Sequence, residues 1–190
     1  MEFNLNSASE EKKYTGPQYQ RPGIAENVKV TKILMEKTSV NNVDYMQLET
    51  VSPDGAVGKS NKMFLSTDVK PGKKTSGWGV TARNIINLLT VTHNIDVDTA
   101  KGLFGTPSSK EEIVKVLSPL LVGKPFRAKF KGQEGRTGAV YAELAGVESM
   151  SITADQTRLK FDPSRDITKY EGVKTSETAN AVNADDSLPF

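Results

Sequence analysis

The chain of 190 residues contains no cysteine and only one histidine, His93. The absence of cysteine excludes disulfide bonds and metal sites built from thiolates. A serine hydrolase would need His93 for its catalytic triad, and no nucleophile motif surrounds this residue. We therefore expect no catalytic residues, no metal site and no cofactor.

Long apolar runs are also missing. No run approaches the roughly 20 residues that cross a bilayer, and the first residues lack the basic and apolar regions of a secretion signal. Hydrophobic residues make up 36% of the chain, below the usual 45–50% or so. These features predict a cytoplasmic protein without membrane contact, in which a moderate core accompanies much polar chain.

Two short motifs that suggest other functions fail on inspection. The string "GAVGKS" resembles a phosphate-binding loop, but Pro53 stands where that motif needs glycine, and a strand follows instead of a helix. Asp96 and Asp98 in "NIDVD" lack the further ligands that a metal ion requires, so a loop or helix cap is the better interpretation of them.

The charge and composition divide the chain into three parts. Residues 1–150 carry a net charge of +4, whereas residues 151–190 carry −2 and no base within the last sixteen positions. We expect a flexible N-terminal arm at 1–22, a folded domain at 23–150 and a flexible, disordered acidic tail at 151–190. Small polar residues dominate from Gly172 onward, which is typical of a linker.

Alternating apolar residues predict three strands, the second at "DYMQLETV" and the third at "KMFLS", residues 62–66. The phase of the first strand shifts after Val30, as a β-bulge would cause. Helical spacing follows in two stretches, and a capping box formed by Ser108 with Glu111, or Ser109 with Glu112, precedes the second. Two further strands follow, and their expected inward residues are Phe126, Ala128, Phe130, Val140, Ala142 and Leu144.

This order predicts a mainly β fold with a helical insert (α+β), namely a five-stranded OB-fold barrel with helices between strands three and four. The helical insert is longer than the single helix usual at this place. A generic small β-barrel and an α+β sandwich are the alternatives that the same pattern allows.

The strand faces opposite the expected core combine aromatic rings with cations. Single-stranded nucleic acid needs this combination, because bases stack on rings while lysine and arginine follow the phosphates. A basic loop, "KPGKKTSGWG", adds two lysines and the only tryptophan. The predicted DNA-binding residues are Tyr45, Lys62, Phe64, Lys73, Lys74, Trp78, Arg127, Lys129, Lys131 and Tyr141.

Each group also has a structural interpretation. Trp78 would cap the barrel, Phe64 would join a second core against the helices, and Lys129 and Lys131 would lie on an ordinary solvated strand face.

The last six residues, "DDSLPF", resemble the acidic C-terminal tip of bacterial and phage single-stranded DNA-binding proteins. The match consists of Asp185, Asp186, Leu188, Pro189 and Phe190, while Ser187 stands where an acid is common. The close resemblance covers these six residues only, and the body matches the family by pattern rather than along the sequence.

The resemblance implies that the tip docks on replication and recombination enzymes such as a polymerase, helicase, primase or nuclease. It implies a protein that coats single-stranded DNA during replication, recombination and repair, and we expect a phage-encoded protein that acts in the host cytoplasm. The alternatives are a phage virion protein with a β-barrel and an OB-fold protein that binds RNA. The residues do not distinguish a monomer from a homo-oligomer.

Overall fold

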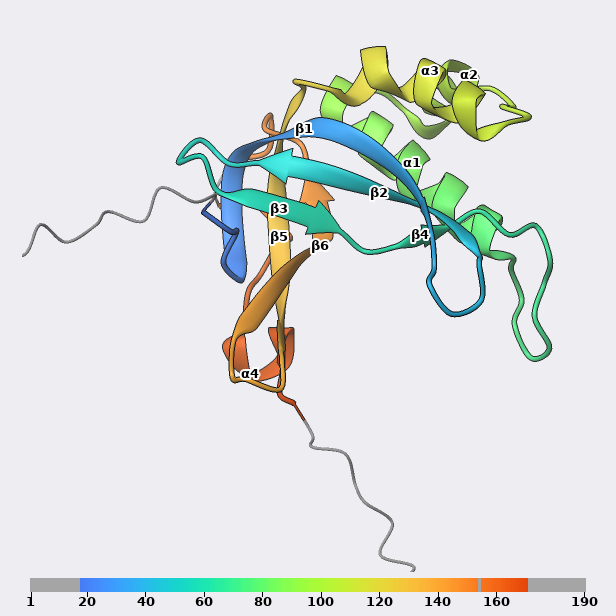
Figure 1. Cartoon of the computed structure of the whole chain (residues 1–190). Helices are drawn as coiled ribbons and strands as arrows, with labels where there is room; N and C mark the ends of the chain where they lie inside the picture. Colours follow the sequence, from blue (N-terminus) through green and yellow to red (C-terminus); the bar gives the residue numbers. More distant parts are fainter. Residues whose placement is uncertain (1–17, 154, 171–190) are drawn as a thin grey trace, which may run out of the picture.

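Five strands close into a mixed β-barrel in the computed structural model, which describes residues 18–153 and 155–170 (Figure 1). In order around the barrel they are β1 (Gly23–Lys37), β2 (Asp44–Val51), β3 (Val57–Ser60), β6 (Val140–Glu148) and β5 (Pro125–Glu134), which pairs again with β1. All neighbours are antiparallel except β3 and β6. The predicted mainly β architecture with helices after the third strand is confirmed at this level.

The first strand is shared between two neighbours because it bends. Its N-terminal half pairs with β5 and its C-terminal half with β2. The register against β5 shifts between Ala25 and Val28, where Asn27 has a φ of 53°, a left-handed conformation that asparagine tolerates better than most residues. The register against β2 shifts between Val30 and Lys32, which confirms the bulge predicted there.

Three helices follow β4 (Met63–Phe64), a short strand that pairs with β2. They are α1 (Gly77–His93), α2 (Val97–Phe104) and α3 (Lys110–Leu121), and they pack on one side of the barrel (Figure 1). Ser109 caps α3 by accepting the Glu112 N–H, and the Glu112 carboxylate accepts bonds from Ser108. Asp96 caps α2, so the helix-cap interpretation of this acid is confirmed.

Apolar residues from the barrel and the helices form one continuous core. It includes Val28, Val30, Met46, Leu48, Met63, Ile85, Leu88, Leu89, Phe104, Ile113, Leu117, Leu121, Phe126, Ala128 and Phe130. The predicted inward positions of β2 and β5 are therefore confirmed. Val140 was expected inside and is exposed, because it begins β6 next to the turn of the β5–β6 hairpin. Across the described residues, no helix is long and apolar enough to cross a membrane.

The two ends of the predicted domain need correction. Residues from 151 were assigned to a flexible tail, yet α4 (Pro163–Asp166) and β7 (Ile167–Thr168) lie against the barrel, and β7 pairs with β5. Gln20 was assigned to the N-terminal arm, and its N–H donates to the carbonyl of Val57. The remainder of the arm, 1–17, and the tail from 171 lie outside the described residues.

Candidate nucleic-acid interface

An exposed aromatic ring and a lysine lie next to each other on β4 and the residues before it. The Phe64 ring is 41% exposed and meets the Tyr45 ring edge-on, with 6.3 Å between the ring centres. Lys62 Nζ lies 4.8 Å from the centre of the Tyr45 ring, so Lys62 and Phe64 both contact this ring. Phe64 therefore offers a surface on which a flat ring can stack, with a cation close by.

Tyr45 was expected to face solvent, and this is wrong. Its side chain is buried because Phe64 and Lys62 cover the ring and its hydroxyl donates to Glu36. The hydrogen bond to Glu36 also raises the pKa of the phenol. Tyr45 supports Phe64 from beneath and is not itself available for stacking.

Lysines without acidic partners stand in the loop that joins β4 to α1. Lys73 and Lys74 are exposed, and the loop turns at Gly72, where the Lys73 N–H donates to the Lys70 carbonyl. Among the described residues, none of Lys62, Lys73 and Lys74 forms an ion pair. Cations that lack a partner can bind phosphate without first breaking a contact.

Trp78 was expected in a loop, but it lies in the first turn of α1, which Ser76 caps. Its ring is half-buried and lies 5.9 Å from the Phe104 ring, centre to centre. The structural interpretation of Trp78 therefore holds for one part of the ring, which packs against the core.

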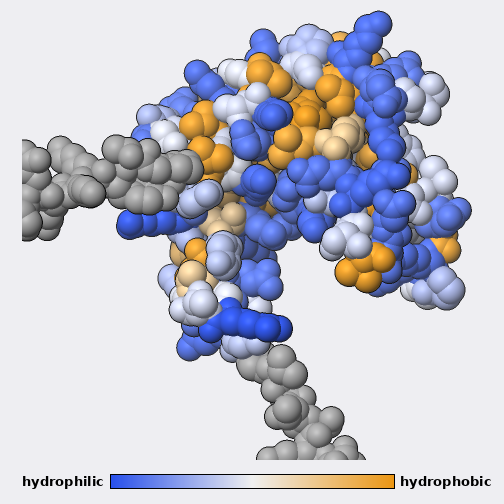
Figure 2. Space-filling model, in the orientation of Figure 1, coloured by the Kyte–Doolittle hydropathy of each residue, from blue (hydrophilic) through white to orange (hydrophobic). Residues whose placement is uncertain are grey.

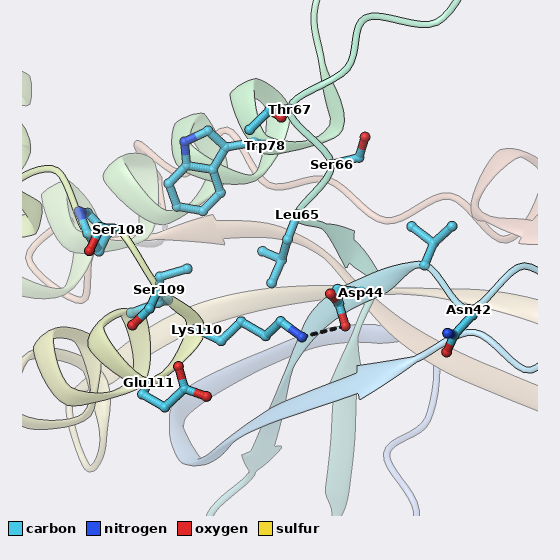
Figure 3. A pocket seen from close by; sticks show the side chains of 13 residues that line it. Asn42, Asp44, Leu65, Ser66, Thr67, Trp78, Ser108, Ser109, Lys110 and Glu111 are labelled. Atoms are coloured by element: carbon cyan, nitrogen blue, oxygen red, sulfur yellow. Dashed lines mark ion pairs between the residues drawn. The ribbon is translucent and has the colours of Figure 1, made fainter.

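The Trp78 side chain also lines a cavity of about 580 Å³ (Figure 3). Apolar side chains such as Leu65 and Ile113 form its walls together with Trp78, and serines of the turn before α3 stand at its rim. At another side the Lys110 ammonium pairs with Asp44 at 2.6 Å, and this hydrogen bond lowers the pKa of the Asp44 carboxyl despite partial burial. A planar, mostly apolar group with polar edges, such as a nucleobase, fits this lining.

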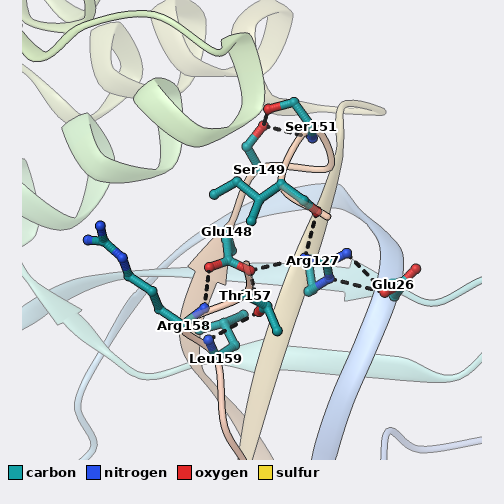
Figure 4. A network of polar contacts seen from close by, with 9 residues as sticks. Glu26, Arg127, Glu148, Ser149, Ser151, Thr157, Arg158 and Leu159 are labelled. Atoms are coloured by element: carbon teal, nitrogen blue, oxygen red, sulfur yellow. Dashed lines mark hydrogen bonds and ion pairs between the residues drawn. The ribbon is translucent and has the colours of Figure 1, made fainter. Parts of the chain in front are cut away.

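Arg127 was also expected to face solvent, and this is wrong as well. Its guanidinium is buried and donates to Glu148 at 3.0 Å, to Glu26 at 3.1 Å and to the Ile152 carbonyl at 3.0 Å (Figure 4). The segments 149–153 and 155–159 lie beside this part of β5 and bond to Arg127 and Glu148. Arg127 therefore joins three segments of the chain and does not contribute to an exposed binding surface.

Glu148 is the centre of the same network. Besides Arg127, it accepts bonds from the Thr157 hydroxyl and the Arg158 N–H (Figure 4). Burial opposes ionisation of this carboxyl, but the three donors together hold its pKa below the usual range. The network is a structural feature that fixes residues 157 and 158 to the barrel.

The outer face of the barrel is not a basic stripe. Cross-strand partners alternate in charge from Lys32 through Glu49, Lys59 and Glu143 to Lys131. Opposite charges at facing positions stabilise a sheet and cancel its long-range field. Lys131 is exposed, as the interpretation of an ordinary solvated strand face predicts. Lys129 was expected to face solvent, and this is wrong: its side chain is only 17% exposed and pairs with Asp166 at 2.7 Å.

The β5–β6 hairpin carries Tyr141, which is 63% exposed. A side chain at Gly135 would approach the Tyr141 ring to 2.8 Å, so the glycine leaves room for the ring to lie over the turn. Arg136 is exposed in the same turn. Arg136 was not among the predicted DNA-binding residues, although its position between two glycines in "GQEGRTG" indicates an exposed turn.

The surface is hollowed between this hairpin and the loops on the opposite side, and mostly hydrophilic residues border the hollow (Figure 2). One border consists of the β1–β2 connection, residues 38–43, and the β4–α1 loop, whose bases adjoin because β4 pairs with β2. We call this hollow with its two borders the candidate groove. The residues that we assign to it are Lys62, Phe64, Lys73, Lys74, Arg136 and Tyr141.

The predicted docking tip, Asp185, Asp186, Leu188, Pro189 and Phe190, lies outside the described residues. Comparisons with known proteins add no relative: no protein-family model matches the chain, and no curated protein matches it. The fold and the chemistry of the candidate groove are therefore the structural indications of function.

Proposed function

We propose that this protein is a non-enzymatic, sequence-independent single-stranded DNA-binding protein with an OB-fold. The strand order around the barrel and the position of the helices between β3 and β5 support this fold assignment. In OB-folds, oligonucleotides bind to the face of strands two and three and to the loops after strands one and four. The corresponding loops here are residues 38–43 and 135–139, which border the candidate groove.

The observation that carries the proposal is the exposed Phe64 side chain beside Lys62, with Tyr141 on the facing hairpin. Lys73 and Lys74 form no ion pair with any residue that the structure describes. Unpaired bases stack on the exposed rings, and the lysines bind the phosphates between them. Every base has an aromatic face, so this mode tolerates all sequences. Duplex DNA has its bases stacked inside the helix and offers the rings nothing to stack on.

In this role the protein coats exposed strands during replication, recombination or repair of a phage genome, within the cytoplasm of the host. The tail then brings partner enzymes to the strand through Phe190 and the acids before it. A linker keeps the tip at high effective concentration near any enzyme on the same strand. This part of the proposal depends on the resemblance of "DDSLPF" to known tips.

Binding of a labelled oligo(dT) of about 30 nucleotides, measured by anisotropy at several salt concentrations, tests the proposal. We expect tight binding to this strand, weak binding to duplex of equal length, and steep loss of affinity with salt because counterions are released. Phe64→Ala should cost about 1–3 kcal/mol of binding free energy, the value typical of a base-stacking ring. Val97→Ala removes an exposed apolar side chain on α2 and should change nothing.

The lysines are tested in the same assay. Lys73→Ala with Lys74→Ala should reduce the slope of log K against log salt by roughly 1.4, which corresponds to two phosphate contacts on a single strand. Lys115→Ala on the exposed side of α3 is the control. Deleting residues 185–190 should preserve DNA affinity while abolishing capture of partner enzymes.

Other outcomes select the alternatives. Equal affinity for oligo(dT) and oligo(U) would assign the groove to RNA as well as DNA. If neither the full chain nor the truncated chain binds single strands, the proposal is wrong, and a β-barrel protein of the virion becomes the better interpretation.

A further inference from the structure

One acidic side chain on α4 lies between two lysines of β5. The Asp166 carboxylate is 2.7 Å from Lys129 Nζ through one oxygen and 3.6 Å from Lys131 Nζ through the other. Asp166 itself is 5% exposed, whereas the Lys131 side chain is 53% exposed. Asp166 is therefore covered, whereas the Lys131 side chain already reaches solvent.

The acid is held as an anion. The hydrogen bond from Lys129, and the one from the Asp162 N–H after it, lower the pKa of Asp166 to about 2. Each Asp166 oxygen faces a different ammonium group, which is how two neighbouring lysines bind the non-bridging oxygens of a phosphate. Asp166 thus has the charge and the hydrogen-bonding pattern of a phosphodiester group of a single strand.

The segment that carries Asp166 is fixed firmly at one end and lightly at the other. Upstream, the Arg158 N–H and the Thr157 hydroxyl bind the buried Glu148. Downstream, β7 contributes only two residues to the sheet, and the Tyr170 N–H reaches Glu134 at 3.3 Å. Residues 162–168 can therefore leave β5 while residues 157 and 158 stay in place.

We infer that Lys129 and Lys131 form a phosphate site that Asp166 occupies in the absence of a strand, and that residues 162–168 are a strap which a bound strand displaces. This inference rests on the proposed function. The site takes a phosphodiester group of the single strand. When the strap is displaced, a phosphate of the strand replaces the Asp166 carboxylate on Lys129 and Lys131. The strap therefore weakens the binding of any ligand that cannot take the place of this carboxylate.

Asp166→Asn tests the strap, and Asp98→Asn is its matched control. Both changes remove one acid that pairs with a lysine, but Asp98 pairs with Lys101 on α2, away from β5. We expect D166N to bind the 30-nucleotide oligo(dT) about two- to tenfold more tightly than wild type, because no ion pair has to be broken first. The salt slope should become steeper by roughly 0.7–1.4, for one or two additional phosphate contacts, while D98N should match wild type in both respects.

The increase in affinity of D166N must depend on Lys129 and Lys131. In a chain that already carries Lys129→Ala and Lys131→Ala, D166N should no longer increase affinity. A gain that persists without the lysines would overturn the inference, as would unchanged affinity and salt slope in D166N. If wild type binds the oligonucleotide and D166N binds equally, the strap is refuted and the proposed function stands. If neither binds, both are refuted.

Hydrogen exchange on the unmodified protein provides a readout that does not depend on the fold of a variant. With saturating oligo(dT), the amide of Thr168, in the strand that pairs with β5, should exchange faster than in the free protein, while those of Thr157 and Arg158 should not. The Ile167 amide donates to the Pro163 carbonyl within the strap and does not report on its displacement. Unchanged or slower exchange of Thr168 would refute displacement of the strap.

Discussion

Replacing Arg127 by methionine should destabilise the fold severely without a specific effect on DNA binding. The side chains of Arg127 and Glu148 are only 6% and 7% exposed and pair at 3.0 Å. Methionine fills a similar volume but leaves the Glu148 carboxylate buried without its counter-charge. The Thr157 hydroxyl and the Arg158 N–H remain as donors, so the acid stays solvated in part.

The expected cost follows from the geometry. Breaking a buried ion pair by removing one partner costs about 3–5 kcal/mol, and in a chain of this size each kcal/mol lowers the melting temperature by roughly 2–4 °C. R127M should therefore melt at least about 6 °C below wild type. The loss of the bonds to Glu26 and the Ile152 carbonyl acts in the same direction.

Urea unfolding followed by circular dichroism measures the change. Arg136→Met removes an exposed arginine from the β5–β6 turn and should alter stability by less than about 0.5 kcal/mol. Adding Glu148→Gln to R127M should recover part of the loss, because the uncompensated charge disappears. Wild-type stability in R127M would refute a structural role for the network. Stability near wild type combined with a large loss of oligo(dT) affinity would return Arg127 to the binding surface.

Two further predictions concern the barrel and the strap. Gly58→Ala should destabilise the protein by about 1–3 kcal/mol, because the new methyl would lie 2.8 Å from Phe130 Cε1 and 3.0 Å from Thr50 Oγ1; a chemical denaturation curve equal to that of wild type would contradict this packing. Asp166 has a lower pKa in the folded chain than its ordinary value of 3.8, so its ionised form stabilises the fold above that value and the contribution is lost as the pH falls through about 2. D166N should therefore lose less stability than wild type between pH 4 and 2, measured by thermal melting.

Periodicity predicted the inward faces of β2 and β5 and the bulge in β1, because these features depend on local patterns. The third strand was expected at residues 62–66, which contain only the short β4, whereas the third strand of the barrel is β3. Phe126, Ala128 and Phe130 alternate with charged residues, and alternation in a strand assigns side chains to opposite faces. The prediction that a serine caps α3 also depended on a local pattern, since Ser109 and Glu112 stand three positions apart.

The errors have a common physical cause. Alternation tells which face of a strand a residue occupies but not whether another segment covers that face. Tyr45 does point away from the main core, yet β4 brings Phe64 and Lys62 over it. Arg127 likewise points outward from β5, where Glu26, Glu148 and the Ile152 carbonyl enclose its guanidinium. These contacts join positions far apart in the chain, and no local pattern encodes them.

Four short elements were missed, namely β3, α2, α4 and β7. The four residues of β3 are too few for alternation to establish a strand. The helix α2 has eight residues, and its apolar side chains are too few to establish a helical period. The α4–β7 segment was assigned to the tail because its composition is polar, although its acid at 166 has two basic partners on β5. The sequence does not distinguish an acid that is paired in the fold from one that is solvated.

The closing pair of the barrel has a consequence for synthesis on the ribosome. Glu26 of β1 and Arg127 of β5 are separated by 101 positions, which take roughly 5–20 s to translate. During that time a nascent chain exposes the β5-facing edge of β1, and the three helices emerge before β5 can cover it. We expect a chain stalled before Pro125 to be cut readily by protease and one stalled well beyond Glu148 to resist. We expect ribosome-associated chaperones to bind the nascent chain while this edge of β1 has no partner strand.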